Sequence, residues 1–173
     1  MAGSAGTTPI VKASIGTTPL LRISLGTTLL WDGQPFTPAS AKLTTAHQTT
    51  TSWAQVLGFT ADAAYPGSAV SSNSLVIPNA GENVTLSASI PFSSGTSYAF
   101  NLTLQLYLNG VSVQTGVQAS APAFGSGTAT VSISGMSVPA GSVLMLHARG
   151  GSQFSSGPNI AANANAYLRA HIP

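Results

Sequence analysis

The chain has 173 residues, enough for one domain of ordinary size and an appendage. Charged residues make up 5% of it and hydrophobic residues 43%, against about 25% charged in an average soluble protein, which disfavours a monomeric enzyme and favours a subunit buried in an assembly. The net charge of +2 comes from five scattered basic residues and three acidic ones, so the sequence does not predict a nucleic-acid-binding surface.

The chain begins with a ten-residue repeat. Gly6-Thr-Thr-Pro-Ile-Val-Lys-Ala-Ser-Ile15 is followed by Gly16-Thr-Thr-Pro-Leu-Leu-Arg-Ile-Ser-Leu25 and by a shorter copy, Gly26-Thr-Thr-Leu-Leu-Trp31. In each full copy Gly and Pro predict a corner, and the alternation after it predicts a short amphipathic strand. Three such strands are too small to fold alone without disulfides, and the chain has no cysteine.

We therefore expect residues 1–33 to form an extended docking arm that pairs with copies of itself or with another protein. The alternative is a meander that packs against the rest of the chain. The apolar residues expected to make the docking contacts are Val11, Ile15, Leu21, Ile23, Leu25, Leu30 and Trp31. The N-terminus lacks the pattern of a signal peptide, and the apolar runs fall short of the roughly 20 residues of a membrane span, so no membrane insertion is expected.

Residues 34–51 are expected to be a linker or an extended crossing segment. Two prolines fall in the sequence Asp32-Gly-Gln-Pro-Phe-Thr-Pro38, and the stretch from Ala46 to Thr51 is polar without an apolar period.

Residues 52–173 predict an all-β domain. Alternating runs separated by Gly, Pro, Asn and Ser cover residues 52–59, 73–77, 83–90, 98–108, 111–116, 127–133, 142–148 and 166–172. Asn109-Gly110 between two of these runs predicts a tight hairpin. Strands at this spacing, without a helical period, indicate an eight-stranded antiparallel jelly-roll sandwich, in which two sheets enclose one core.

This domain resembles the tumour necrosis factor and complement globular-head superfamily. The likeness lies in Tyr65-Pro-Gly, in the run from Leu75 to Gly81, in Tyr107-Leu-Asn-Gly110, in Val138-Pro-Ala-Gly-Ser142 and in the closing Tyr167–Ile172. The resemblance implies a homotrimer whose aromatic side faces meet around a threefold axis. It makes Tyr98, Phe100, Tyr107 and Tyr167 the interface candidates, with ordinary core packing as the alternative.

The N-terminal repeats resemble the short repeats at the front of minor tail proteins and other virion proteins of tailed phages that infect actinobacteria. Such proteins join this kind of leader to varied C-terminal domains. The sequence departs from the pattern at Ser24-Leu25, where a Tyr is expected, and in its shorter length. The resemblance implies a virion component and does not separate a tail role from capsid decoration.

Few side chains are available for acid–base or metal chemistry. The acidic residues and histidines are Asp32, Asp62, Glu82, His47, His147 and His171. Asp32 and Glu82 stand beside glycines at turn positions, and His147 and His171, although both in late strands, have no further ligand at a metal-binding spacing. The sequence also has no nucleophile-elbow or phosphate-loop motif, so we expect no catalytic residue, metal or cofactor.

Two hypotheses about function follow. In the first, the chain is a phage structural protein made in the bacterial cytoplasm, docked to capsid or tail proteins by its repeats and projecting a trimeric head toward the host surface. Loops 118–128 and 150–165 are then candidates for contact with a host glycan through Phe124 and Phe154, or are plain solvent-facing loops. In the second, the chain is a free multimeric carbohydrate-binding, lectin-like module.

Overall fold

The computed structural model describes residues 14–15, 18–19, 23–25, 28–31, 35–151, 156–163 and 165–173. The chain forms two compact units, Met1–Pro35 and Phe36–Pro173. In the first unit, β1 (Ser14–Ile15) pairs antiparallel with β2 (Thr18–Pro19), and β3 (Ile23–Leu25) pairs antiparallel with β4 (Thr28–Trp31).

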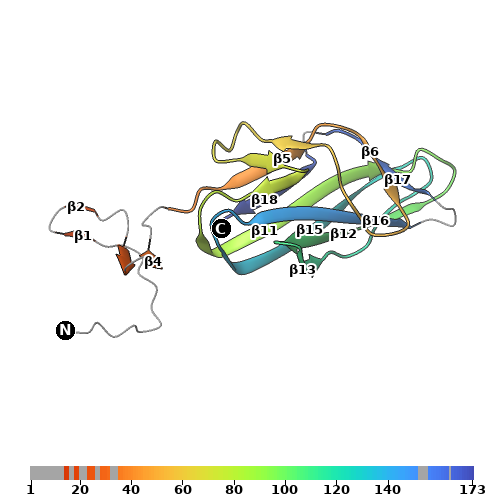
Figure 1. The fold of residues 1–173 in the computed structure, drawn as a ribbon. Helices are drawn as coiled ribbons and strands as arrows, with labels where there is room; N and C mark the ends of the chain where they lie inside the picture. Colours follow the sequence, from red (N-terminus) through yellow and green to blue (C-terminus); the bar gives the residue numbers. More distant parts are fainter. Residues whose placement is uncertain are drawn as a thin grey trace. The chain divides into compact units, whose positions relative to one another are not determined.

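The second unit is a sandwich of two antiparallel sheets (Figure 1). We call the first the β12 sheet. Its strand order is β13 (Val111–Thr115), β12 (Phe100–Leu108), β16 (Val143–Gly151), β10 (Ser74–Val76) and β9 (Ala69–Ser71), with β14 (Ala119–Ala121) beside β12 and β7 (Ala54–Gln55) beside β16.

The second sheet is called the β11 sheet. Its strand order is β6 (His47–Thr50), β17 (Ser156–Ile160), β11 (Gly81–Ser93), β18 (Tyr167–His171), β5 (Ala39–Leu43) and β8 (Phe59–Ala61), with β15 (Ser126–Val138) beside β11. The long strands alternate between the two sheets along the sequence, and the described residues contain no helix. The predicted all-β jelly roll is therefore confirmed.

Strict alternation in the sequence produces the core. In β12, Leu102, Leu104 and Leu106 are fully buried, while the residues between them are half-buried on the outer face. Side chains of β11 close the core from the opposite sheet, including Leu86 and Ile90. Because successive side chains of a strand point to opposite faces, this alternation fixes which face of each sheet is inward.

The hairpin predicted at Asn109-Gly110 is confirmed. Leu108 pairs with Val111, and Asn109 and Gly110 have φ angles of +51° and +81°. Positive φ at both central positions is the geometry of the tightest hairpin turns, which Asn-Gly adopts readily.

The segment expected to be a linker contains two strands of the β11 sheet. Residues 39–43 form β5, which pairs with the C-terminal strand β18, and residues 47–50 form β6, which pairs with β17. Ala39, Ala41 and Leu43 alternate into the core. Two of these three residues are alanine, which has a low β-propensity, so the sequence signal for a strand is weak.

The sandwich has two distinct ends, which the 13 residues of β11 separate by about 40 Å. At the start of β11, Gly81 pairs with Val138 of β15, and at its end Ser93 pairs with Ser126. The C-terminal strand reaches the first end, because His171 pairs with Thr85 (Figure 1). We call the end at Gly81 the Phe36 end, because Phe36 lies beside Gly81, and the end at Ser93 the Phe124 end.

Candidate interaction surfaces

The second unit begins at the Phe36 end. A side chain added at Gly81 would collide with the ring of Phe36, which is partly buried against the core. Next along the chain, the Thr37 hydroxyl accepts a hydrogen bond of 3.0 Å from the side-chain amide of Asn79. The chain that follows residues 1–35 is therefore fixed to the sandwich beside the first residue of β11.

Two exposed aromatic residues lie at the Phe124 end. Phe124 is 76% exposed and Tyr98 is 50% exposed. Their loops are joined, because the Phe124 amide donates a hydrogen bond of 2.8 Å to the Thr96 carbonyl and the Ser94 amide donates one of 3.1 Å to the Gly125 carbonyl. Phe124 has a φ of +53°, which is unusual for a bulky side chain.

The outer face of the β12 sheet carries two pairs of contacting side chains. The Tyr107 and His147 rings lie 4.3 Å apart between centroids, and the Arg149 guanidinium lies 5.0 Å from the centre of the Trp53 ring. The Tyr107 hydroxyl donates to the Gln105 side-chain oxygen at 3.2 Å. Burial lowers the pKa of His147 below 6.5, so this imidazole is mainly neutral at pH 7.

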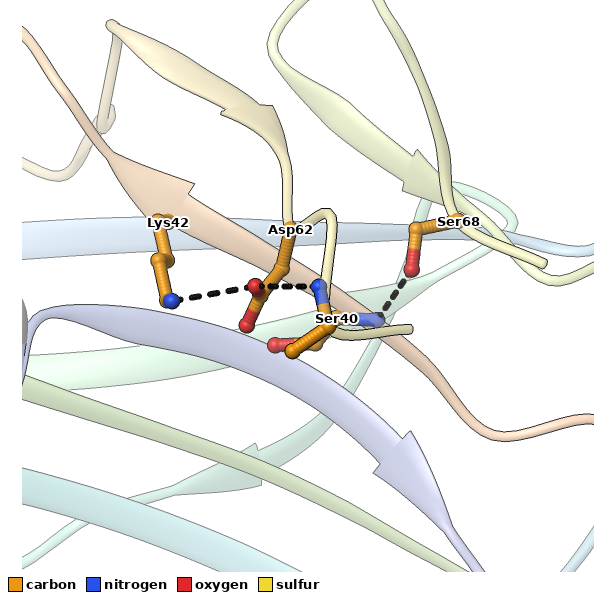
Figure 2. Close-up of polar contacts among 5 residues, drawn as sticks. Ser40, Lys42, Asp62 and Ser68 are labelled. Atoms are coloured by element: carbon orange, nitrogen blue, oxygen red, sulfur yellow. Dashed lines mark hydrogen bonds and ion pairs between the residues drawn. The ribbon is translucent and has the colours of Figure 1, made fainter. Parts of the chain in front are cut away.

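The outer face of the β11 sheet carries a second aromatic–cation cluster. The Arg169 guanidinium lies 4.4 Å from the centre of the Tyr167 ring and 4.8 Å from that of Tyr65. Tyr65 belongs to the loop after β8, whose Asp62 amide donates to the Ser40 carbonyl at 2.9 Å. The Ser40 amide in turn donates to the Ser68 hydroxyl at 2.8 Å, so both ends of this loop are fixed to β5 (Figure 2).

An ion pair strengthens that attachment. The Lys42 ammonium lies 3.0 Å from the Asp62 carboxylate, whose side chain is 3% exposed (Figure 2). Burial opposes ionisation of Asp62, but the hydrogen bond from Lys42, the amide of Ala64 and the Lys42 charge outweigh it. The pKa of Asp62 therefore lies below its ordinary value of 3.8, and the carboxylate stays charged.

The two histidines of the late strands lie in different sheets. His147 lies in β16 of the β12 sheet, whereas His171 lies in β18 of the β11 sheet. Within the described part of the chain, no three His, Cys, Asp or Glu side chains come close enough to hold a metal ion. Glu82 accepts a hydrogen bond of 2.7 Å from the Ser137 hydroxyl.

The interface candidates from the sequence fall in different places. Phe100 faces inward and is 5% exposed, so its side chain is not available to a neighbouring chain. Tyr107 and Tyr167 are half-buried on opposite outer faces, and Tyr98 lies at the Phe124 end.

The predicted docking contacts are not described by the structure. Val11 and Leu21 lie outside the described residues. The remaining docking candidates, Ile15, Ile23, Leu25, Leu30 and Trp31, are described by their backbone strands alone. Phe154 also lies outside the described residues, and of the two candidate glycan-stacking residues Phe124 is therefore the one that the structure describes.

Sequence reasoning missed the two aromatic–arginine clusters. Tyr167 and Arg169 are two apart in one strand, a spacing that places both on the same face. Tyr65 lies in the loop after β8, and Trp53 lies just before β7. Both are distant in sequence from the arginines that they contact, so no local pattern predicts these contacts.

No helix that could span a membrane is formed by the residues that the structure describes.

No protein-family model matches the sequence, and no curated protein has a significantly similar sequence. The structure is similar to that of Eiger TNF from S. frugiperda, with a TM-score of 0.55 and 10% sequence identity over 79% of this chain and 92% of that chain. Crystal structures of murine APRIL at pH 5.0 and pH 8.5 give TM-scores of 0.46 at 10% identity, over 77% of this chain and 97% of those chains. The similarity to Eiger TNF establishes the fold as a TNF-like jelly roll.

Proposed function

We propose that this protein is a structural component of a tailed-phage virion, either a minor tail protein or a capsid decoration protein. Residues 1–33 dock it to other virion proteins, and the jelly roll projects from the particle as a trimeric head without enzymatic activity. The repeats that resemble phage virion leaders and the TNF-like fold of the head support this assignment.

The polarity of the sandwich is the observation that carries the proposal. The chain leaves the N-terminal unit and joins the head at Phe36, beside the start of β11. The exposed aromatic residues Tyr98 and Phe124 lie at the other end of the same strand, about 40 Å away. A head attached through its N-terminal side presents its aromatic loops at the end opposite the attachment point.

The scarcity of charge supports the proposed trimer. The described part of the head has the cations Lys42, Arg149 and Arg169, and Lys42 is paired with Asp62. Charged residues are depleted at the centres of interfaces, and both outer faces of the sandwich offer half-buried aromatic side chains instead. We propose that one of these faces packs around a threefold axis.

Deletion of residues 1–33 tests the docking role. The truncated chain retains Phe36 and the whole core, so we expect it to fold and to form the same oligomer as the full chain in light scattering. It should not sediment with virions when it replaces the full chain during infection. Normal incorporation of the truncated chain into particles would overturn the docking role.

A further inference from the structure

We propose that the loops at the Phe124 end form a binding site for a neutral saccharide, with Phe124 as the stacking residue and Tyr98 beside it. The site consists of residues 94–99 and 121–128. The inference depends on the proposed function only for its biological setting, since it places the contact with the host surface at the end of the head opposite Phe36.

The conformation of Phe124 is the first observation. Its φ of +53° lies in the left-handed region, where a side chain as large as phenylalanine is strained. Hydrogen bonds hold it there, from the Phe124 amide to Thr96 and from the Gly125 amide to Pro122, at 2.8 Å and 2.9 Å. Glycine or asparagine would fit this backbone better, so packing and turn geometry do not explain a phenylalanine here.

The exposure of Phe124 is the second observation. The ring is 76% exposed, so the strained residue gains little from burial in its own chain. Tyr98, on the loop that supplies the Thr96 carbonyl, is 50% exposed. Two adjoining ordered loops therefore present a pair of large aromatic side chains to solvent.

The chemistry of the loops selects the ligand class. Neither segment 94–99 nor segment 121–128 contains a charged residue, so nothing there favours a phosphate, a carboxylate or a nucleic acid. The exposed residues of these two segments include Ser97 and Ser126, whose side chains carry hydroxyl groups, and Thr96, whose hydroxyl also contacts the Tyr98 backbone. A neutral sugar has an apolar C–H face that stacks on an aromatic ring and hydroxyls that hydrogen-bond to serine and threonine, so it matches this surface.

Binding to a saccharide array tests the proposal with the full chain. The array carries neutral glucans, mannans, galactans and arabinans, together with acidic polygalacturonate as a comparison. We expect the wild-type chain to bind at least one neutral saccharide and Phe124→Asn to weaken that binding by roughly tenfold or more. Phe124→Trp should retain it, and Val117→Asn, which removes a side chain that is 87% exposed at another position, should leave it unchanged.

The melting temperature separates loss of the site from loss of the fold. Because asparagine tolerates positive φ, Phe124→Asn should raise the melting temperature by roughly 2 to 4 °C while it weakens binding. Failure of the wild-type chain to bind any neutral saccharide would overturn the proposal, as would unchanged binding by Phe124→Asn. Neither result depends on particle attachment, so the saccharide site and the docking role of residues 1–33 fail or succeed separately.

Discussion

The Lys42 ammonium and the Asp62 carboxylate lie 3.0 Å apart, and they join β5 to the loop that carries Tyr65. The Asp62 side chain is 3% exposed, whereas the Lys42 side chain is 41% exposed. Replacement of Asp62 therefore leaves a solvated cation, whereas replacement of Lys42 leaves a buried anion without its cation.

We expect Asp62→Asn to lower the free energy of unfolding at pH 7 by about 1 to 3 kcal/mol, and Lys42→Met to lower it by more. The depressed pKa of Asp62 makes its contribution complete above the ordinary value of 3.8 and lost as the pH falls through the lower folded value. The difference between wild type and Asp62→Asn should thus shrink in acid. Urea unfolding at pH 7 and pH 3 measures the difference in unfolding free energy between wild type and Asp62→Asn. An equal difference at both pH values would contradict this account.

His47 and His147 should make the fold less stable in mild acid. Burial lowers both pKa values below 6.5, so the unfolded chain binds protons more readily than the folded one. The contribution of the neutral imidazoles is complete above 6.5 and is lost as the pH falls through the lowered values. Thermal melts between pH 7.5 and pH 5 should show a slope that His147→Gln reduces and that the double variant with His47→Gln reduces further. An unchanged slope in the double variant would show that other groups dominate.

Gly150 and Gly151 offer a matched pair of substitutions. A Cβ at Gly150 would lie 2.5 Å from Pro158 Cδ and 2.6 Å from Gly157 Cα, where β16 and β17 approach closely. A Cβ at Gly151 would meet its nearest neighbour, Asn101 Cβ, at 3.8 Å. Gly150→Ala should therefore lower the unfolding free energy by about 1 to 3 kcal/mol and Gly151→Ala should change it little. Chemical denaturation of the two variants decides the point, and equal losses at both positions would contradict crowding at Gly150 as the cause.

The long strands could be predicted from the sequence because their alternation is unbroken. Residues 98–108 alternate without interruption, and β12 runs from Phe100 to Leu108. The hairpin at Asn109-Gly110 followed from the need for positive φ at both positions. In these places the local sequence pattern agrees with the tertiary structure, so the pattern alone was enough to predict the strand and the turn.

The short strands and the surface clusters could not be predicted in this way. Residues 39–43 become a strand because Tyr167, Leu168, Arg169 and Ala170 provide an edge more than 120 positions later in the chain. The Arg169 cluster likewise depends on Tyr65, which a loop brings to the sheet. The local pattern of a segment does not say which distant segment it pairs with, and this also applies to the strained Phe124 turn, whose anchor is Thr96.

Tyr107 and Tyr167 point away from the core on opposite sides of the sandwich, so they cannot both lie at the centre of one closed threefold interface. A trimer that packs one outer face around the threefold axis leaves the opposite outer face on its outside, and contacts between unlike faces close into a ring only where the rotation between copies closes. The β11 sheet is the better candidate, because its outer face beside Tyr167 carries small hydroxyl residues. The buried Ser89 pairs with Tyr167 and the exposed Thr130, and Ser87 pairs with Arg169 and the exposed Ser132, so a second copy can approach Thr130 and Ser132 closely.

We therefore expect Thr130→Arg to convert the proposed trimer to monomers, because it adds a bulky charged side chain to this face while its exposed position spares the fold. Tyr167→Ala should weaken the trimer in the same direction, whereas Tyr107→Ala and Asn101→Arg, on the opposite face, should leave it intact. Phe100→Ala should instead lower stability by about 3 to 5 kcal/mol, since the ring is buried in the core. Light scattering at several protein concentrations, combined with thermal melts, separates these outcomes. Dissociation by Tyr107→Ala and Asn101→Arg, with no effect of Thr130→Arg, would move the threefold contact to the β12 sheet.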